Sequence, residues 1–389
     1  MDDLARCRDI LGDLIGFPTV TSDSNLACIA YIAEKLGEAG ARVEILTDPS
    51  GQKANLFATL GPERSGGLVL SGHTDVVPVE DQPWTMDPWR MEERDGRLYG
   101  RGACDMKGFV AACLAKLDVL KAAALERPIH FAFTHDEEIG CVGARDLVEV
   151  LKARDVRPAL AVIGEPTMMQ VVEGHKGCCE YTVTFTGAEG HGSDPARGVN
   201  AVEYAARYVN RLLELRQALM DRCPPGSRFE PPFTTLNVGG LHGGHSHNVI
   251  AGKAVLDWEM RPVVWDDLDF VKAELEAFVG DVLLPQMRRV APNADITTQT
   301  IGEVAGLTPM AQNAARDLMC KLTGANGAGL VPFGTEAGLF QQIGMDAVIC
   351  GPGSIEQAHK PDEYVALDQL AQCLQMLDRL GAEYGRRGT

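Results

Sequence analysis

The chain has 389 residues, of which 45% are hydrophobic and 23% are charged, a composition typical of a folded globular protein rather than a disordered or fibrous one. This length predicts two domains. The 36 basic and 54 acidic residues give a formal net charge of −18, so the field of the protein repels phosphate backbones and anionic lipid, and neither nucleic acid nor a membrane is expected as a partner.

The remaining composition points to an intracellular protein. No apolar run approaches the roughly 20 residues of a membrane-spanning helix, and residues 1–17 have the pattern of an amphipathic helix rather than of a signal peptide. The 11 cysteines are odd in number and include no CxxC pair, so a disulfide framework is not expected. We therefore expect a cytoplasmic protein.

Short β-rich runs alternate with helical patterns in the first part of the chain, which is typical of an α/β domain. In chain order, we predict strands at 56–60 and 68–70, a helix at 106–120, a strand at 129–134, a helix from 144 and a strand at 159–163. In the helix at 106–120 the apolar residues follow the 3.6-residue period, which predicts one buried face.

The pattern changes after Gly177. The predicted order is a strand at 181–185, a helix at 200–215, strands at 234–238 and 254–260, a helix at 267–289 and a strand at 295–301. This β-α-β-β-α-β order is a split βαβ, or ferredoxin-like, unit. The α/β pattern then resumes, with a helix at 310–322, a strand at 347–350 and a helix at 367–380. We therefore predict a discontinuous α/β catalytic domain with a mixed sheet, residues 1–178 and 304–389, around an inserted α+β domain, residues 179–303.

Histidine and acidic residues follow the predicted strands of the first domain. They are His73 and Asp75 in LVLSGHTDVVP, Asp105 in GRGACDMKG, Glu137 and Glu138 in FAFTHDEEIG, Glu165 in AVIGEPT, and His359 in GPGSIEQAHKPDEY. Each motif alone is weak, because an HxD sequence is commonly an ordinary loop and a pair of glutamates is commonly solvated surface. Since open α/β sheets bind their ligands at the carboxyl ends of their strands, together these residues predict one site.

The residue types in this set suit divalent metals. Two histidines with three carboxylates can hold two divalent ions that share a bridging carboxylate, with zinc favoured and cobalt or manganese as alternatives. Asp75 is placed to accept the second ring N–H of His73. One glutamate of the pair then remains, and neighbours at a strand end point in opposed directions. We expect Glu138 to be a ligand and Glu137 to take a proton from the attacking water and pass it to a leaving amine, the chemistry of amide hydrolysis.

The motifs SGHTDVVP, GRGACDMKG, HDEEIG, IGEPT, EGHKG, GAEGHGS and GPGSIEQAHKPDEY, between residues 68 and 364, resemble those of a family of di-zinc aminoacylases and carboxypeptidases with the zinc exopeptidase fold. It contains glutamate carboxypeptidase, succinyl-diaminopimelate desuccinylase and acetylornithine deacetylase. The resemblance implies that Asp105 bridges two metals, that Glu138 and His359 complete one site, and that His73 and Glu165 complete the other. It also implies that Asp75 orients His73, that Glu137 is the general acid/base, and that the peptide bond from Asp105 to Met106 is cis.

The resemblance also implies that the inserted domain is a lid through which a homodimer forms. His191 would reach the active site of the other subunit and stabilise the oxyanion, Asn248 would contact the substrate, and Arg261 would bind its carboxylate. For His191 the alternative is a surface loop, and for Arg261 it is a surface ion pair. The histidines of LHGGHSHNVI, His242, His245 and His247, are interpreted as loop residues.

Two segments, GTEA at 334–337 and GPGSIEQAHKPDEY, resemble the acetylornithine deacetylase branch. The expected reaction is therefore removal of an N-acyl group from an amino acid, with N-acetyl-L-ornithine in arginine synthesis as the favoured substrate. Thr335 and Glu336 are then expected substrate contacts, with Glu336 reading the distal ammonium or, alternatively, capping the following helix. Desuccinylase, general aminoacylase, carboxypeptidase or dipeptidase activity remains open, and so, more distantly, does a non-catalytic binding protein of this fold.

Overall fold

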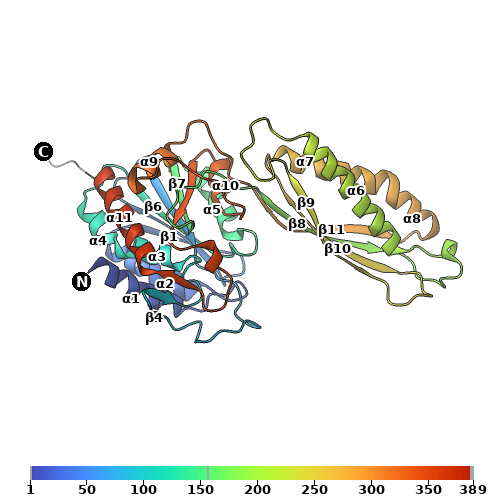
Figure 1. Cartoon of the computed structure of the whole chain (residues 1–389), viewed down its shortest axis with the longest axis horizontal. Coiled ribbons are helices and arrows are strands. Elements are labelled where there is room, and N and C mark those ends of the chain that lie inside the picture. Colours follow the sequence, from blue (N-terminus) through green and yellow to red (C-terminus); the bar gives the residue numbers. More distant parts are fainter. Residues whose placement is uncertain (1, 156, 386–389) are drawn as a thin grey trace. The chain divides into compact units, whose positions relative to one another are not determined.

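The structure is a computed structural model that describes residues 2–155 and 157–385, and its chain divides into two compact units (Figure 1). Unit 1 extends over Met1–Gly174, Pro309–Val331 and Thr335–Thr389, and unit 2 over His175–Thr308 and Pro332–Gly334. The first domain is thus discontinuous in sequence.

Unit 1 is built on a mixed six-stranded sheet of order β1-β2-β6-β3-β7-β12. The strands are β1 (Arg42–Thr47), β2 (Ala54–Leu60), β3 (Leu68–His73), β6 (Ile129–Thr134), β7 (Leu160–Pro166) and β12 (Asp346–Gly351). β6, β3, β7 and β12 are parallel to their neighbours in that series, whereas β1 and β2 pair antiparallel at one edge. The carboxyl ends of four parallel strands therefore meet at one edge of the sheet.

Helices cover both faces of this sheet. Along β3, Leu68 and Leu70 join the main core cluster and Val69 between them does not, although all three are buried, because neighbouring side chains of a strand point to opposite faces. The same cluster holds side chains of α1 (Asp3–Ile15), α2 (Leu26–Glu38), α3 (Lys107–Ala115), α9 (Ala314–Thr323) and α11 (Leu367–Tyr384). The buried side chains of α5 (Val142–Lys152) and α10 (Ala337–Gln342) lie outside it, as expected for helices on the other face.

The predicted helix at 106–120 is two helices in the structure, α3 and α4 (Leu117–Ala122), with Lys116 between them. All residues of α3 are buried, so the prediction of a single buried face was wrong there. Small side chains such as Ala111 and Ala112 on its remaining faces allow α1 and α11 to pack against it. Between these helices, the Lys116 ammonium forms ion pairs with Asp3 and Asp378.

A small antiparallel sheet completes unit 1. It has the order β13-β5-β4, with β4 (Glu92–Arg94), β5 (Arg97–Tyr99) and β13 (Tyr364–Ala366). Because β13 follows the segment of His359 and β5 precedes the turn of Asp105, this sheet brings together two distant parts of the chain. The short strands of this sheet were not predicted.

Unit 2 has the predicted β-α-β-β-α-β order and an antiparallel sheet of order β11-β8-β10-β9. Its strands are β8 (Cys178–Thr186), β9 (Thr235–Gly243), β10 (Lys253–Arg261) and β11 (Asp295–Val304), and its helices are α6 (Ala201–Asp221), α7 (Asp266–Ala277) and α8 (Leu284–Val290), with a π-helical turn at Phe278–Leu283. The Asn200 side chain caps α6 by accepting from the backbone N–H groups of Val202 and Glu203.

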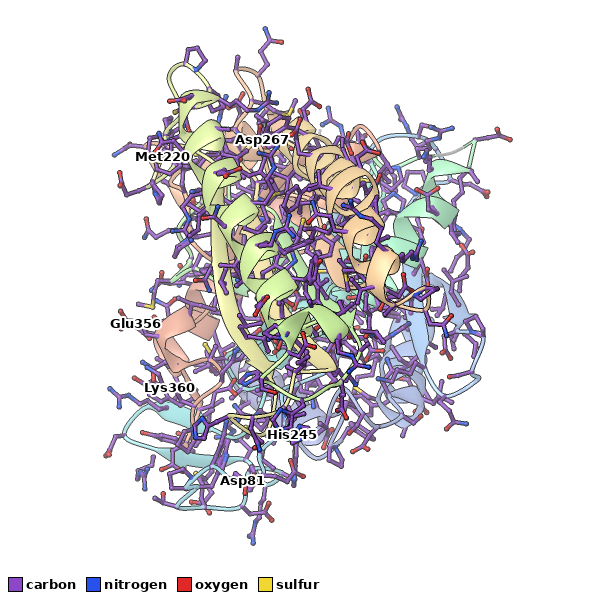
Figure 2. All side chains as sticks on the ribbon, turned by 90° about the vertical axis from the view of Figure 1, so that its right-hand side faces the viewer. Asp81, Met220, His245, Asp267, Glu356 and Lys360 are labelled. Carbon is purple, nitrogen blue, oxygen red and sulfur yellow. The ribbon has the colours of Figure 1, made fainter. Side chains whose placement is uncertain are left out.

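The helices of unit 2 cover one face of its sheet. Tyr181, Val183 and Phe185 of β8 alternate into a core that they share with α6 and α7. Figure 2 shows α6 and α7 side by side, with Met220 of α6 and Asp267 of α7 at the same end, where Asp267 Oδ1 accepts from Arg222 Nε at 2.9 Å. β9 extends to Gly243, so His242 lies in a strand and its interpretation as a loop residue was wrong; pairing with β10 continues to Ala254. No helix of the described residues is long and apolar enough to cross a membrane.

Candidate metal centre

The candidate residues of unit 1 gather at the carboxyl edge of its large sheet. His73 is the last residue of β3, Glu165 lies near the end of β7, and Glu137 and Glu138 lie in the turn that follows β6. His73 pairs in register with Thr134 of β6, so the ends of these two parallel strands are level. Asp105 joins them from the turn that precedes α3.

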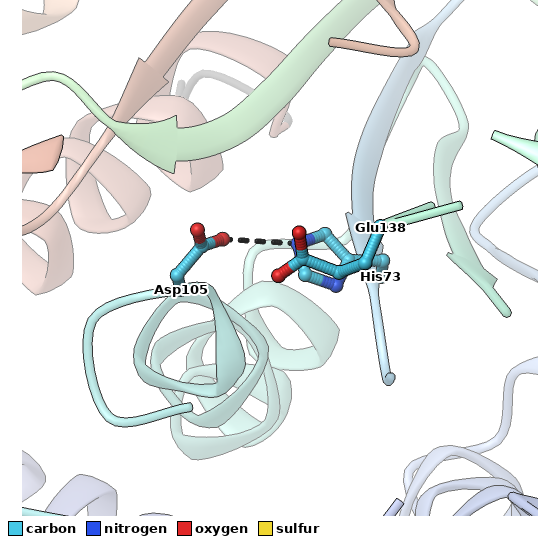
Figure 3. Close-up of side chains that lie close together, drawn as sticks. All are labelled: His73, Asp105 and Glu138. Carbon is cyan, nitrogen blue, oxygen red and sulfur yellow. Dashed lines mark hydrogen bonds and ion pairs between the residues drawn. The ribbon is translucent and has the colours of Figure 1, made fainter. Parts of the chain in front are cut away.

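Asp105 lies between the two imidazoles. Its Oδ1 is 3.0 Å from His73 Nε2, and its Oδ2 is 3.4 Å from His359 Nε2 (Figure 3 shows the first of these contacts). His73 Nε2 is also 3.8 Å from Glu165 Oε1, and His359 Nε2 is 3.0 Å from Glu138 Oε2. A carboxylate that offers one oxygen to each of two ligand sets has the geometry of a bridging ligand.

These donors fit divalent metal ions. Donor atoms of His73, Asp105 and Glu138 lie within 4.8 Å of one another, and so do those of His73, Glu137 and Glu165. Imidazole nitrogen together with carboxylate oxygen is the donor set of zinc, and it also suits cobalt and manganese. His73 is 1% exposed and Asp105 is 5% exposed, so both are held away from bulk water.

The cluster brings several buried carboxyl groups close together, and this changes their pKa values. Burial raises the pKa of Glu137 to about 8 and raises the pKa of Glu138 and of Glu165. Burial also acts to raise the pKa of Asp105, but hydrogen bonds with His359 and His73 hold that pKa below its usual range. Mutually repelling carboxylates of this kind fit a bound group that supplies positive charge.

Asp75 serves the site in two ways. His73 Nδ1 is 2.9 Å from the Asp75 backbone oxygen and 3.6 Å from its Oδ1, so the carbonyl, rather than the expected carboxylate, makes the shorter contact. The Asp75 carboxylate instead accepts from the backbone N–H groups of Glu137, at 3.1 Å, and Glu138, at 3.2 Å. It thereby anchors the turn that carries both glutamates.

Glu137 and Glu138 point toward different partners. The alternation of side chains at a strand end predicts such opposed directions, but both residues lie in the turn after β6. Glu138 contacts His359, whereas Glu137 groups with His73 and Glu165. Asp136, just before them, has a φ of 54°, a left-handed conformation that turns the chain here. The thiol of Cys141, a residue that the sequence did not single out, lies 3.4 Å from Glu137 Oε1 as a hydrogen-bond donor.

Thr335 and Glu336 lie inside unit 1 and do not face solvent. Thr335 is 0% exposed and its Oγ1 accepts from the backbone N–H of Ala337, while Glu336 is 1% exposed and its carboxylate accepts from the hydroxyls of Ser71 and Thr134. Glu336 makes no side-chain capping bond to α10. The helix-capping alternative for Glu336 is therefore wrong, because its oxygens link β3 and β6 and the Thr335 hydroxyl, not the Glu336 carboxylate, accepts the first backbone N–H of α10. Substrate contact by Thr335 and Glu336 stays a prediction.

The remaining candidates belong to unit 2. His191 is exposed and its Nδ1 lies 2.7 Å from Ser193 Oγ, and the exposed Asn248 accepts from Ser246 Oγ at 2.8 Å. Arg261, at the end of β10, is half-buried and forms an ion pair of 2.8 Å with Glu259. An ion pair of this kind is the alternative to substrate binding that was given for Arg261 above.

Sequence reasoning missed the polar network behind Asp105. Glu363 accepts hydrogen bonds from the backbone of the Asp105 turn, and Arg101 pairs with Glu363 at 2.8 Å. Both residues lie within the quoted motifs GRGACDMKG and GPGSIEQAHKPDEY, but nothing in either motif alone indicates that the two side chains meet. The peptide bond from Asp105 to Met106 is cis, as the resemblance implies.

The fold and this donor set define a class, the metal-dependent hydrolases. Comparison with known proteins agrees: the sequence profile described as Peptidase family M20/M25/M40 matches residues 69–383. The chain is also 36% identical, over 364 residues that cover 92% of each chain, to a protein named acetylornithine deacetylase from Shigella sonnei (strain Ss046). The chain therefore belongs to peptidase family M20/M25/M40, and it is a hydrolase.

Solved structures share the fold. An M20 family metallo-carboxypeptidase from Sulfolobus solfataricus aligns with a TM-score of 0.76 at 17% identity, covering 99% of both chains. A dinuclear metal binding peptidase of the M20 family from Bacillus subtilis aligns with a TM-score of 0.64 at 17% identity, covering 98% of both chains. These alignments confirm the mixed α/β fold predicted from the sequence.

Proposed function

We propose that the protein hydrolyses N-acetyl-L-ornithine to L-ornithine and acetate, as a two-metal, cytoplasmic homodimer in arginine biosynthesis. The observation that carries this proposal is that His73 and His359 both contact Asp105, while Glu137 lies near His73 and Glu165. The similarity to the protein named acetylornithine deacetylase supports the choice of substrate.

We propose His73, Asp105, Glu138, Glu165 and His359 as the ligands of two divalent ions, zinc in the first instance. When bound, these ions supply positive charge that polarises the acyl carbonyl and favours deprotonation of water at neutral pH. Asp75 holds His73 through its backbone carbonyl, which fixes the ring so that Nε2 faces Asp105.

Glu137 is the proposed general acid/base. Its Oε1 accepts from the Cys141 thiol, which leaves Oε2 to receive a proton from the attacking water. The water oxygen forms a bond to the acyl carbon, the bond from that carbon to nitrogen breaks, and the proton held on Glu137 passes to the leaving nitrogen. The position of Glu137 supports this role, because it lies with His73 and Glu165 beside the proposed ligands while Glu138 contacts His359.

Residues of unit 2 are proposed to recognise the substrate. His191 would stabilise the oxyanion in the site of the partner subunit, Asn248 would contact the substrate, and Arg261 would bind its carboxylate. The exposure of His191 and Asn248 supports their availability. For Arg261, the competing interpretation is a surface ion pair with Glu259.

A panel of substrates tests the proposal. Metal-loaded protein is assayed with N-acetyl-L-ornithine, N-acetyl-L-methionine, N-succinyl-diaminopimelate and a dipeptide, with Glu137→Gln as the matched inactive control. We expect the highest kcat/KM for N-acetyl-L-ornithine. A higher value for another substrate would reassign the enzyme to a desuccinylase, general aminoacylase or peptidase of the same family, and no turnover of any of the four would overturn the proposed deacetylase activity.

A further inference from the structure

A buried carboxylate outside the proposed ligand set contacts the turn that carries Asp105. Glu363 is 1% exposed, and its Oε1 accepts from the backbone N–H of Cys104 at 2.8 Å and of Asp105 at 3.0 Å. Its Oε2 accepts from the backbone N–H of Gly102 at 3.1 Å and from Arg101 at 2.8 Å. Both oxygens are therefore used, and three of the four donors belong to the backbone of one turn.

Arg101 extends this network toward His359. The guanidinium is also 1% exposed and lies 4.9 Å from the Trp84 ring, and it donates to the Gln82 side-chain oxygen and, at 3.3 Å, to the Lys360 backbone oxygen. The Gln82 amide then donates to the backbone oxygen of His359 at 3.1 Å. In Figure 2, the labels of Asp81 and Lys360, the chain neighbours of Gln82 and His359, mark these two loops.

The ligands differ in how the fold positions them. His73 and Glu165 lie on β3 and β7, where His73 pairs with Thr134 of β6, and Pro166, next to Glu165, pairs with Gly351 of β12. Asp105 lies in a turn, and His359 lies between the 3₁₀ turn Ile355–Gln357 and β13, with a φ of 61° and a side chain that is 52% exposed. These two ligands therefore depend on side-chain contacts for their position.

We propose that Glu363, with Arg101 and Gln82, is a positioning clamp that sets Asp105 and His359 at the spacing required to bind two metals. A purely stabilising role explains the pair poorly, because removing two charges from water costs free energy that an ion pair often fails to recover. Negative charge on Glu363 is needed in this arrangement, since four N–H donors converge on its two oxygens and a neutral amide accepts through only one.

The inference rests on the proposed function, and its test measures metal binding directly. In the full chain, Glu363→Gln keeps the shape of the side chain but places an NH₂ group against a donor. We expect the affinity for Zn²⁺, measured by competition with a chromophoric chelator, to fall by about tenfold or more. The visible absorption spectrum of the Co²⁺-loaded protein is expected to change, and kcat to fall while KM stays within about twofold.

Two further variants control the experiment. Glu173→Gln breaks another ion pair of unit 1, in which the buried Glu173 carboxylate lies 3.0 Å from the partly exposed Arg316, and is expected to lower the melting temperature while leaving metal affinity unchanged. Gln82→Ala removes a half-buried side chain of a loop, a change expected to leave the fold intact. It should weaken Zn²⁺ binding by about threefold, less than Glu363→Gln, since it removes the hydrogen bonds of Gln82 to Arg101 and to the His359 backbone but leaves those of Glu363 to the Asp105 turn.

The outcomes separate the two proposals. Glu363→Gln could keep the wild-type affinity for Zn²⁺ and an unchanged Co²⁺ spectrum and show only a lower melting temperature. That result would overturn the clamp and leave the Glu363–Arg101 pair with a stabilising role alone. If Glu363→Gln does not fold, wild-type metal affinity in Gln82→Ala overturns the clamp. If the unmodified chain binds neither Zn²⁺ nor Co²⁺, the proposed function fails and the clamp fails with it.

Discussion

The two units present their candidate residues in opposite ways. In unit 1, His73 and Glu165 are 1% and 4% exposed and are held by strands and polar contacts. In unit 2, His191 and Asn248 are exposed, with hydrogen bonds to near neighbours in sequence. Groups that hold metals and transfer protons need fixed geometry, whereas groups that meet a substrate need access. This difference in exposure fits the proposal that unit 1 holds the metals and unit 2 contacts the substrate.

The largest effect is expected from Glu137→Gln in unit 1. Because Glu137 is proposed to move the proton and not to bind metal, the variant should keep both metals and the fold while kcat falls by at least about a hundredfold. Metal analysis and initial rates check this. Near-normal turnover in metal-loaded protein would remove Glu137 from the mechanism.

The next prediction concerns the exposed side of the comparison, His191. If His191 acts in the partner's site, His191→Ala should lower kcat by about a hundredfold, as loss of an oxyanion donor does. Mixing His191→Ala subunits with Glu137→Ala subunits should then give one working site in each heterodimer. Activity is measured after the subunits have exchanged, with each variant alone as the control. Absence of recovery would exclude action across a dimer.

Glu336→Gln distinguishes a buried supporting residue from a substrate contact. Because the Glu336 carboxylate accepts from Ser71 and Thr134, we expect the variant to lose about 1 to 3 kcal/mol in kcat/KM for N-acetyl-L-ornithine and for N-acetyl-L-methionine alike, with a lower melting temperature. Parallel kinetics on the two substrates provide the measurement. A loss confined to N-acetyl-L-ornithine would return Glu336 to the ammonium end of the substrate.

The smallest expected effect concerns stability and involves both units, since each buries a neutral histidine. Burial lowers the pKa of His130 in unit 1 and of His175 in unit 2 from 6.5 to about 4. Between these values the unfolded chain binds the proton and the folded chain does not, so the free energy of unfolding falls as the pH falls from about 6.5 to 4, by about 1 kcal/mol per pH unit for each histidine.

Replacing His130 with Gln removes one of these titrating groups. Denaturant unfolding between pH 7 and pH 4 should show a shallower pH dependence for His130→Gln than for the unmodified chain. His175→Gln is the matched variant in the other unit. An unchanged slope in both variants would show that the pKa of each imidazole is the same in the folded and the unfolded chain.

Much of this protein could be predicted from local sequence. The strand at 129–134 has the predicted bounds, and the order of elements in unit 2 follows from alternation and helical periodicity. Those signals are local because the spacing of apolar residues that is typical of a strand or a helix can be recognised within a few residues. The small strands β4, β5 and β13 are too short to show such a period, and they were missed.

The candidate site divides in the same way. The sequence by itself indicated which histidines and acids follow strands, because the carboxyl ends of parallel strands meet at one edge whatever the packing details. Only the tertiary structure decided that Asp105 faces both imidazoles, that Glu336 is buried against Ser71 and Thr134, and that Glu363 supports the Asp105 turn. Those contacts join residues from 32 to 265 positions apart. A buried charge needs a partner, but a local sequence pattern does not indicate which distant side chain that partner is.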